Sequence, residues 1–221
     1  PNRPVEKVSW ADAQIFLTRL NAQQSANSPS GWAYVLPTES QWEYACRAGT
    51  TTMYSWGNDI NATRANYSVS GLSQTRDVGY YAANPWGFFD MHGNVWEWTA
   101  DWYQTAYPTG NPVVDPTGPA SGSHRVTRGG SWGVDGPHLR SARRNDITPS
   151  SRYNTLGFRV GFQFTGQHGV DLNASVKLDM LWVEPGTFTM GSPTTEAGRA
   201  ADREDEHNVT LTQGFYLGKY E

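Results

Sequence analysis

The stretch that decides the fold runs from Arg125 to Phe162 and reads RVTRGGSWGVDGPHLRSARRNDITPSSRYNTLGFRVGF. A Gly-Gly-Ser-Trp turn opens it and the apolar run 156–160 closes it, whereas the residues between show no helix or strand periodicity. Long irregular loops between ordered anchors are usually functional or disordered. This loop is rich in aromatic, amide and guanidinium side chains, which favours a functional role.

The composition indicates one sizeable domain and excludes several classes of protein. At 221 residues the chain suits a single domain, and its ten Trp and eleven Tyr predict an aromatic core. A net charge of -4 gives no electrostatic case for nucleic-acid binding. No apolar run approaches the roughly 18 residues needed for membrane insertion. The single cysteine excludes an intrachain disulfide.

Two helices are predicted from local signals. The first begins at Ser9, because Ser9 and Asp12 fit a capping box. Its apolar side chains recur at helical spacing: Ala13, Phe16, Leu17 and Leu20. The second begins at Thr38 and ends at Gly49. It presents an apolar side made of Trp42, Ala45 and Cys46.

Short strands are predicted where β-branched and aromatic residues gather between turn residues. They are Leu156–Phe162, Val176–Val183, Thr187–Met190, Asn208–Leu211 and Phe215–Leu217. Asn, Gly, Pro, Ser and Thr dominate residues 55–83 and 107–124, which we therefore expect to be loops.

Residues 125–162 resemble the C-terminal part of the formylglycine-generating enzyme (sulfatase-modifying factor) family. Further motifs agree with it: LPTESQWEYACRAG at 36–49, NPWGFFDMHGNVWEW at 84–98, RGGSW at 128–132 and WVEPGTFTMG at 182–191. The resemblance implies a variant of the C-type lectin fold that is often stabilised by calcium. We therefore expect one α+β domain over residues 1–221, with two helices, short antiparallel strands and much loop.

The order of the motifs differs from the family. Residues 170–221 correspond to the family's N-terminal part and residues 1–166 to the remainder. A circular permutation, one frame of a tandem array, or two fragments in altered order would each give this arrangement. The helix that should connect residue 221 to the start is missing, which favours an incomplete or re-ordered sequence.

In any of these arrangements we expect a single core, because about fifty residues bury too little surface to fold alone. Val176–Val183 should pair with Leu156–Phe162 as a neighbouring strand. The late apolar residues should pack with Trp42, Trp96 and Phe158; they are Leu178, Leu181, Val183, Phe188, Phe215 and Tyr216.

The family's copper chemistry is not expected here. Its enzymes hold copper with two cysteines in the loop after the Gly-Gly-Ser motif, and soft thiolates suit Cu(I). The matching stretch, 132–140, contains no cysteine, and neither Val134 nor Pro137 can bind copper. Cys46 lies beside Trp42 on a predicted helix, where a lone cysteine is usually a packing residue. We expect neither copper nor formylglycine formation.

Calcium is the cofactor that the resemblance implies. The family's ligands correspond to the carbonyls of Gly93 and Val95 and the carboxylate of Glu97, with Asn94 adjacent. Calcium prefers such oxygen ligands, several of them from the backbone. Alternatively, Asn94 and Glu97 cap turns around a cluster of tryptophans. A second family site would use Asn66 and the Tyr67 carbonyl, although its acidic partner loop is shortened here.

The leading functional hypothesis is a non-catalytic module that binds a protein or glycan ligand. The loop frame also resembles the variable proteins of diversity-generating retroelements, which diversify the residues between fixed anchors. This places candidate contacts at Trp132, Val134, Asp135, His138, Arg140, Arg143, Asn145, Asp146, Tyr153 and Asn154. Arg144 matches a family arginine at the edge of the active site. We expect a prokaryotic extracellular or cell-surface location.

Two other functions stay open. The first is a divergent metal-dependent oxidase built on histidines, which are His92, His124, His138, His168 and His207. None of them form an i, i+4 or His-x-His pair. The acidic run 202–207 suits a solvated loop, with a His-carboxylate metal site at His207 as the alternative. The second is a structural subunit of an extracellular assembly, since aromatic loops also serve self-assembly.

Overall fold

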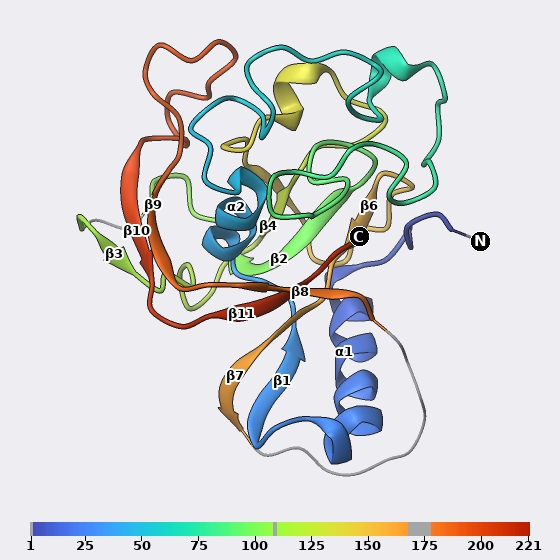
Figure 1. Ribbon diagram of the computed structural model, residues 1–221, viewed down its shortest axis with the longest axis vertical. Helices are drawn as coiled ribbons and strands as arrows, with labels where there is room; N and C mark the ends of the chain where they lie inside the picture. The colour runs from blue at the N-terminus through green and yellow to red at the C-terminus, as the bar shows by residue number, and fades with distance from the viewer. Residues whose placement is uncertain (1, 108–109, 168–177) are drawn as a thin grey trace.

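A computed structural model describes residues 2–107, 110–167 and 178–221 (Figure 1). The described residues form two α-helices, α1 (Trp10–Gln24) and α2 (Glu39–Arg47). Short 3₁₀ turns cover Ser25–Asn27, Ser68–Ser70 and Gly136–Leu139. The strands are β1 (Gly31–Val35), β2 (Trp96–Trp102), β3 (Val113–Val114), β4 (Arg125–Arg128), β5 (Asn145–Ile147), β6 (Leu156–Phe158), β7 (Gly161–Gln167), β8 (Met180–Val183), β9 (Gly186–Met190), β10 (His207–Leu211) and β11 (Phe215–Gly218).

Both predicted helices are confirmed, and their capping boxes are formed. Ser9 Oγ accepts a hydrogen bond from the backbone N–H of Asp12 at 3.1 Å, and the Asp12 carboxylate accepts from the N–H of Ser9 at 2.9 Å. Thr38 and Gln41 do the same for α2. Trp42 and its two apolar neighbours on α2 are fully buried. Phe16 is 41% exposed, and its ring contacts Phe158 with centroids 5.5 Å apart.

The strands in the described part form three small sheets. Their orders are β1-β7-β11-β8, β3-β10-β9 and β5-β4-β2-β6. Pairing is antiparallel except for β10 with β3 and β2 with β6. Figure 1 shows α1 with β1 and β7 at one end of the molecule, and α2 among long loops at the other. Neither helix in the described residues is long and apolar enough to cross a bilayer. The predicted α+β class is confirmed.

The predicted strand Leu156–Phe162 is two strands in different sheets. β6 pairs with β2, whereas β7 pairs with β1 and β11. Arg159 lies between them with its side chain buried against Glu97, so the chain turns there. The expected pairing of this run with Val176–Val183 was wrong, because β11 lies between β7 and β8. The first two residues of that predicted strand lie outside the described residues.

The late segment shares its core with the rest of the chain. One apolar cluster joins Trp42 to Val183 and Phe215, with Leu181 and Phe188 packed against it. A second joins Trp96, Phe158 and Leu178. Tyr216 does not take part in these clusters, because alternation along β11 turns its side chain outward between buried Phe215 and Leu217.

The outer edge of β1 is closed by a side chain of α1. Asn21 Nδ2 donates to the carbonyl of Tyr34 at 2.8 Å, and Asn21 Oδ1 accepts from the N–H of Tyr34 at 2.7 Å. One amide side chain therefore satisfies both backbone groups of this edge residue.

Candidate functional site

The predicted recognition loop starts from a rigid turn. Gly129 and Gly130, which follow β4, have φ of 94° and 79°, in the left-handed region that glycine tolerates. A Cβ on Gly130 would lie 2.7 Å from the Leu139 side chain and 2.9 Å from the His138 carbonyl. The turn therefore packs directly against the 3₁₀ turn Gly136–Leu139, which fixes the first part of the loop.

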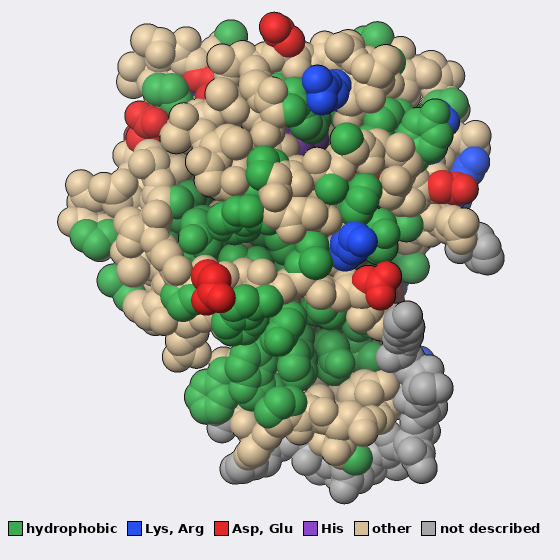
Figure 2. All heavy atoms as spheres, viewed as in Figure 1, with side chains coloured by type: hydrophobic (Ala, Val, Ile, Leu, Met, Phe, Trp, Pro, Cys, Tyr) green, Lys and Arg blue, Asp and Glu red, His purple; other side chains and the backbone are tan. Residues whose placement is uncertain are grey.

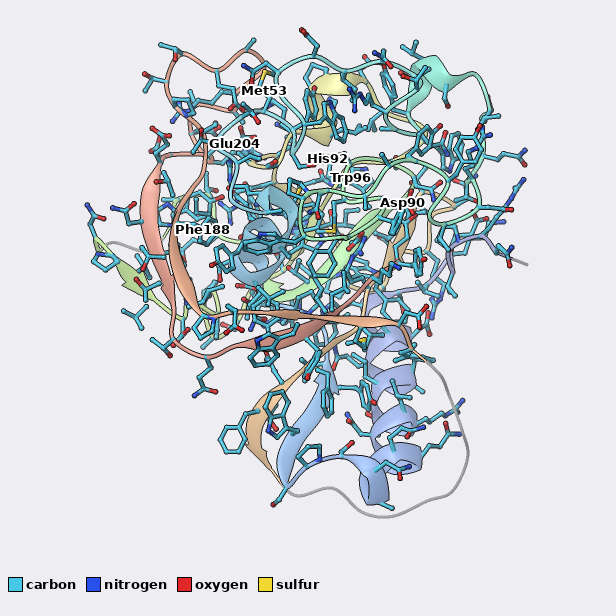
Figure 3. The ribbon with its side chains drawn as sticks, viewed as in Figure 1. Met53, Asp90, His92, Trp96, Phe188 and Glu204 are labelled. Carbon is cyan, nitrogen blue, oxygen red and sulfur yellow. The ribbon has the colours of Figure 1, made fainter. Side chains whose placement is uncertain are left out.

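Arg140 points into the protein, contrary to its predicted role as a ligand contact. Its side chain is fully buried, and it donates to Glu196 at 2.5 Å and to Glu204 at 2.8 Å. Both carboxylates come from the long connection between β9 and β10, where Figure 3 labels Glu204. A buried guanidinium needs such partners to offset its desolvation. Glu204, which the sequence places in a solvated loop, is itself fully buried.

Arg144, which matches a family arginine at the edge of the active site, is buried as well. Its guanidinium binds Glu39 through two nitrogens, at 2.6 and 2.8 Å. Glu39 also lies 3.4 Å from Arg128, which in turn pairs with Glu43. Burial alone would raise the pKa of Glu39, but the charges of Arg144 and Arg128 outweigh it and lower the pKa. Nothing in the sequence pattern marks Glu39 and Glu43 as partners of the loop.

Arg143, Asn145 and Asp146 lie at the edge of the protein with partners of their own. Arg143 is partly exposed and lies 3.5 Å from Glu204. Asn145 Nδ2 donates to Thr127 Oγ1 at 3.0 Å, and Asp146 lies 3.6 Å from Arg203. These three side chains already have partners within the protein, so they are less free to contact a ligand than the outer part of the loop.

The remaining candidates face solvent at least in part, and together we call them the outer loop residues. They are Trp132, Val134, Asp135, His138, Tyr153 and Asn154. The Trp132 indole N–H donates to the Asn154 carbonyl at 3.0 Å, which joins the two ends of the loop. Ser68 donates to the Asp135 carboxylate at 2.8 Å. Tyr153 is 54% exposed.

Cys46 lies beneath this loop and is closed to solvent. Its Sγ is 3.6 Å from His92 Nε2, and His92 Nδ1 lies 2.7 Å from the Leu139 carbonyl (Figure 3). Burial raises the pKa of the Cys46 thiol to about 12 and lowers that of His92 to about 4. Both groups are therefore neutral at pH 7, and the expectation that Cys46 is a packing residue is confirmed.

The motif expected to hold calcium forms a tight turn before β2. Gly93 and Asn94 have φ of 111° and 66°. The Glu97 carboxylate is buried and accepts from Arg159 at 2.6 and 2.9 Å and from the Trp42 indole at 2.7 Å. Glu97 therefore already has side-chain partners from α2 and from the turn between β6 and β7.

Further acidic groups gather at this turn. Asn94 Nδ2 donates to the Glu221 carboxylate, whose Oε2 is buried with no hydrogen-bond partner among the described residues. Burial and the nearby charges of Asp90 and Glu97 raise the pKa of Glu221 well above its usual range. Burial likewise raises the pKa of Asp90 to about 6. Three acidic side chains, Asp90, Glu97 and Glu221, therefore surround the guanidinium of Arg159.

The second expected calcium site lies at Asn66 and the Tyr67 carbonyl. Asn66 Oδ1 and the Tyr67 carbonyl both lie 2.7 Å from Ser70 Oγ. One hydroxyl hydrogen can serve only one of these two oxygens. Asn66 also donates to Asn94 at 2.9 Å, which links the two expected sites.

The histidines are dispersed. Within the described residues, no three His, Cys, Asp or Glu side chains are grouped to hold a metal ion. His207 stacks on Tyr107 at 4.3 Å, and its Nδ1 lies 3.0 Å from the Asp205 carbonyl. His168 lies outside the described residues.

The sequence of this chain is similar to those of known proteins. The formylglycine-generating enzyme of Streptomyces coelicolor is 36% identical over 177 residues, covering 72% of this chain and 52% of the relative. The mouse protein named inactive C-alpha-formylglycine-generating enzyme 2 is 33% identical over 173 residues, covering 71% and 48%. The chain thus spans about half the length of the curated relatives it matches.

Solved structures are similar to this chain in both fold and sequence. Treponema denticola variable protein 1 matches with a TM-score of 0.64 and 30% identity, covering 74% of this chain and 72% of the other. PvdO from Pseudomonas aeruginosa matches with a TM-score of 0.62 and 29% identity, covering 72% and 62%. A family profile described as the sulfatase-modifying factor enzyme 1-like domain matches residues 1–163. The chain therefore belongs to the sulfatase-modifying factor enzyme 1-like domain family.

Proposed function

We propose that this domain is a non-catalytic binding module whose outer loop residues contact a protein or glycan ligand. The observation that carries the proposal is the state of its thiol. The chain has one cysteine, and it is buried with a raised pKa rather than paired with a second thiol in the loop. A thiolate pair that could hold Cu(I) is therefore missing from this sequence.

The construction of the loop supports a binding role. Arg140 and Arg144 anchor its inner side to buried carboxylates, whereas Trp132 and Tyr153 stay accessible. Aromatic side chains held on a rigid base lose little conformational entropy when they bind a partner. Two relatives are compatible with this role, since one is named inactive and another a variable protein.

Calcium is part of the proposal. Its ligands would be the carbonyls of Gly93 and Val95 and the carboxylate of Glu97, as in the family. The acidic side chains grouped at this turn support a cation there, and the buried Glu221 Oε2 has no hydrogen-bond partner among the described residues. A bound calcium would brace the turn that carries β2. Calcium would support the loop indirectly, through this turn, and needs no redox chemistry to do so.

The ligand-binding proposal is tested with a glycan array and a displayed peptide library. Wild-type protein should select ligands from one of them, and Trp132→Ala with Tyr153→Ala should lose the binding. The matched control is Tyr80→Ala, since Tyr80 is 60% exposed outside the loop. Binding that survives the loop changes, or stoichiometric copper with oxidation of a cysteine peptide, would overturn the proposal.

The calcium proposal is tested separately by thermal unfolding with and without a chelator. A ligand that binds only the folded state stabilises it according to its free concentration relative to Kd. Chelation should therefore lower the Tm by several degrees, and Glu97→Gln should abolish that difference. Identical curves, with no calcium found by elemental analysis, would contradict the site.

A further inference from the structure

A second surface lies on the β1-β7-β11-β8 sheet, away from the loop. Cross-strand register places Trp32 opposite Phe164, and Tyr216 opposite both Phe162 and Trp182. Residues paired directly across strands share a face. We call the resulting group the aromatic face: Trp32, Tyr34, Phe162, Phe164, Trp182 and Tyr216. Figure 2 shows hydrophobic side chains gathered over β1 and β7 at this end of the molecule.

The rings of the aromatic face contact one another while remaining open to solvent. Trp182 and Tyr216 have centroids 5.0 Å apart, and Tyr34 and Phe162 have centroids 4.6 Å apart. Phe164 is 51% exposed, Trp182 43% and Tyr216 38%. A contiguous exposed apolar patch marks an interaction site more often than scattered surface residues do.

Two glycines set these rings against the backbone. A Cβ on Gly214 would lie 2.1 Å from the Trp182 ring, and a Cβ on Gly31 would lie 2.4 Å from the Phe164 ring. Any larger residue would push the ring away. Glycine at these two positions therefore leaves the space that the Trp182 and Phe164 rings occupy.

A polar cleft of about 190 Å³ borders the aromatic face and shares Phe164 with it, and Gly214, on which the Trp182 ring packs, also lines the cleft. Its other walls carry amides and hydroxyls, from Thr38, Gln41, Thr117, Gln163 and Gln213. Among the described residues no Lys or Arg lines it, and its Asp115 carboxylate accepts from the backbone N–H of Thr212 at 2.8 Å. The cleft therefore suits a neutral ligand that is rich in hydroxyl groups.

We propose that the aromatic face and this cleft bind a neutral polysaccharide. A sugar ring has an apolar C–H face that stacks on an aromatic ring, and a rim of hydroxyls that hydrogen-bond to amides. Both halves of that chemistry lie side by side here. A nucleic acid would need cations for its phosphates, and a purely apolar partner would desolvate polar side chains of the cleft, such as Thr117 and Gln213, without giving them hydrogen bonds. The site shares no residue with the outer loop residues, so it stands independently of the proposed function.

Affinity electrophoresis tests this proposal with mixed-linkage β-glucan, galactomannan and dextran as probes in native gels. At least one polysaccharide should retard the wild-type protein. Trp182→Ala and Phe164→Ala should each weaken that binding by roughly tenfold or more, because each removes a stacking ring. Trp182→Phe should retain part of it. The control is Tyr80→Ala, which removes an exposed ring outside both the aromatic face and the outer loop and should bind as the wild type does. Trp132→Ala tests whether the outer loop takes part in this binding.

Three results would overturn the proposal. The first is the absence of retardation by all three polysaccharides. The second is equal loss of binding in the Trp132 and Trp182 variants, which would place the contact elsewhere. The third is a wild-type dimer in sedimentation that Trp182→Ala converts to a monomer, since the face would then serve contact between copies of the chain. Circular dichroism of each variant verifies that it is folded.

Discussion

Two regions of the molecule are stabilised in different ways. The loop region around α2 uses buried ion pairs between distant segments, such as Arg140 with Glu204 and Arg144 with Glu39. The region of α1 and the β1-β7-β11-β8 sheet uses apolar packing, with Leu17 and Leu20 buried against it. Irregular backbone has few ladder hydrogen bonds, so charged side chains bridge the loops in their place. Such pairs define a conformation more than they add net stability.

The largest expected effect comes from breaking a buried pair in the loop region. Glu204→Gln removes one of the two carboxylates paired with Arg140, and the one beside Arg143, and should cost about 3–5 kcal/mol. This corresponds to a Tm lower by roughly 6–20 °C for a domain of this size. Glu206→Gln, two residues away on an exposed side chain, should change stability by less than about 0.5 kcal/mol. Equal effects in thermal unfolding would show that the ion pairs do not distinguish the loop region.

A smaller effect is expected at Asp101, a carboxylate beside α2. Burial and the charge of Glu39 raise the pKa of Asp101 to about 7, above its value in the unfolded chain. The folded state therefore binds a proton that the unfolded state has lost, and Asp101 makes stability fall as pH rises from about 4 to 7. Asp101→Asn should remove this slope and add on the order of 2–4 kcal/mol at pH 8.

The measurement is chemical denaturation of both proteins from pH 4 to pH 8. Asparagine retains the oxygen that accepts from the backbone N–H of Glu39 at 2.7 Å. The two stability curves should converge near pH 4 and separate toward pH 8. Parallel curves would mean that the Asp101 carboxylate is balanced by charges in the folded state.

Helix caps should contribute equally in both regions. Ser9→Ala removes the cap of α1 and Thr38→Ala removes that of α2, and each should cost about 1 kcal/mol. Denaturant midpoints with unchanged m-values are the measurement. A much larger loss at Thr38 would indicate that α2 depends on its end more than α1 does, because its surroundings lack a regular sheet.

The smallest effect belongs to the outer loop residues. Tyr153→Ala should change stability by less than about 0.5 kcal/mol, since the side chain is 54% exposed and the backbone supplies its hydrogen bond to Lys7. Thermal unfolding checks this. A loss of several degrees would place Tyr153 among the residues that hold the loop together.

The sequence predicted what is encoded locally and missed what is encoded at a distance. The capping boxes at Ser9 and Thr38 lie within four residues, and both helices were predicted correctly from them. Arg140 and Arg144 have the same sequence character as exposed arginines, whereas their carboxylate partners lie 56 to 105 residues away. No periodicity reports such a pairing, so the burial of Arg140 and Arg144 could not be predicted from the loop's own sequence.

The division of the run 156–162 has the same origin. Its residues have strand character throughout, but the buried pair of Arg159 with Glu97, 62 residues apart, forces a change of sheet in the middle. The alternation of Tyr216 and Trp182 with buried neighbours could have been read from sequence, and it is the signal that locates the aromatic face.

The amide of Asn21 has a consequence for the behaviour of the protein at high concentration. An edge strand with free N–H and C=O groups beside an aromatic surface is a template on which further strands can add, which is how aggregation begins. Here Tyr34, on the edge strand β1, already has both groups occupied. The molecule can therefore expose an apolar sheet face while Tyr34 offers no free backbone group to which a strand of a neighbouring molecule could bond.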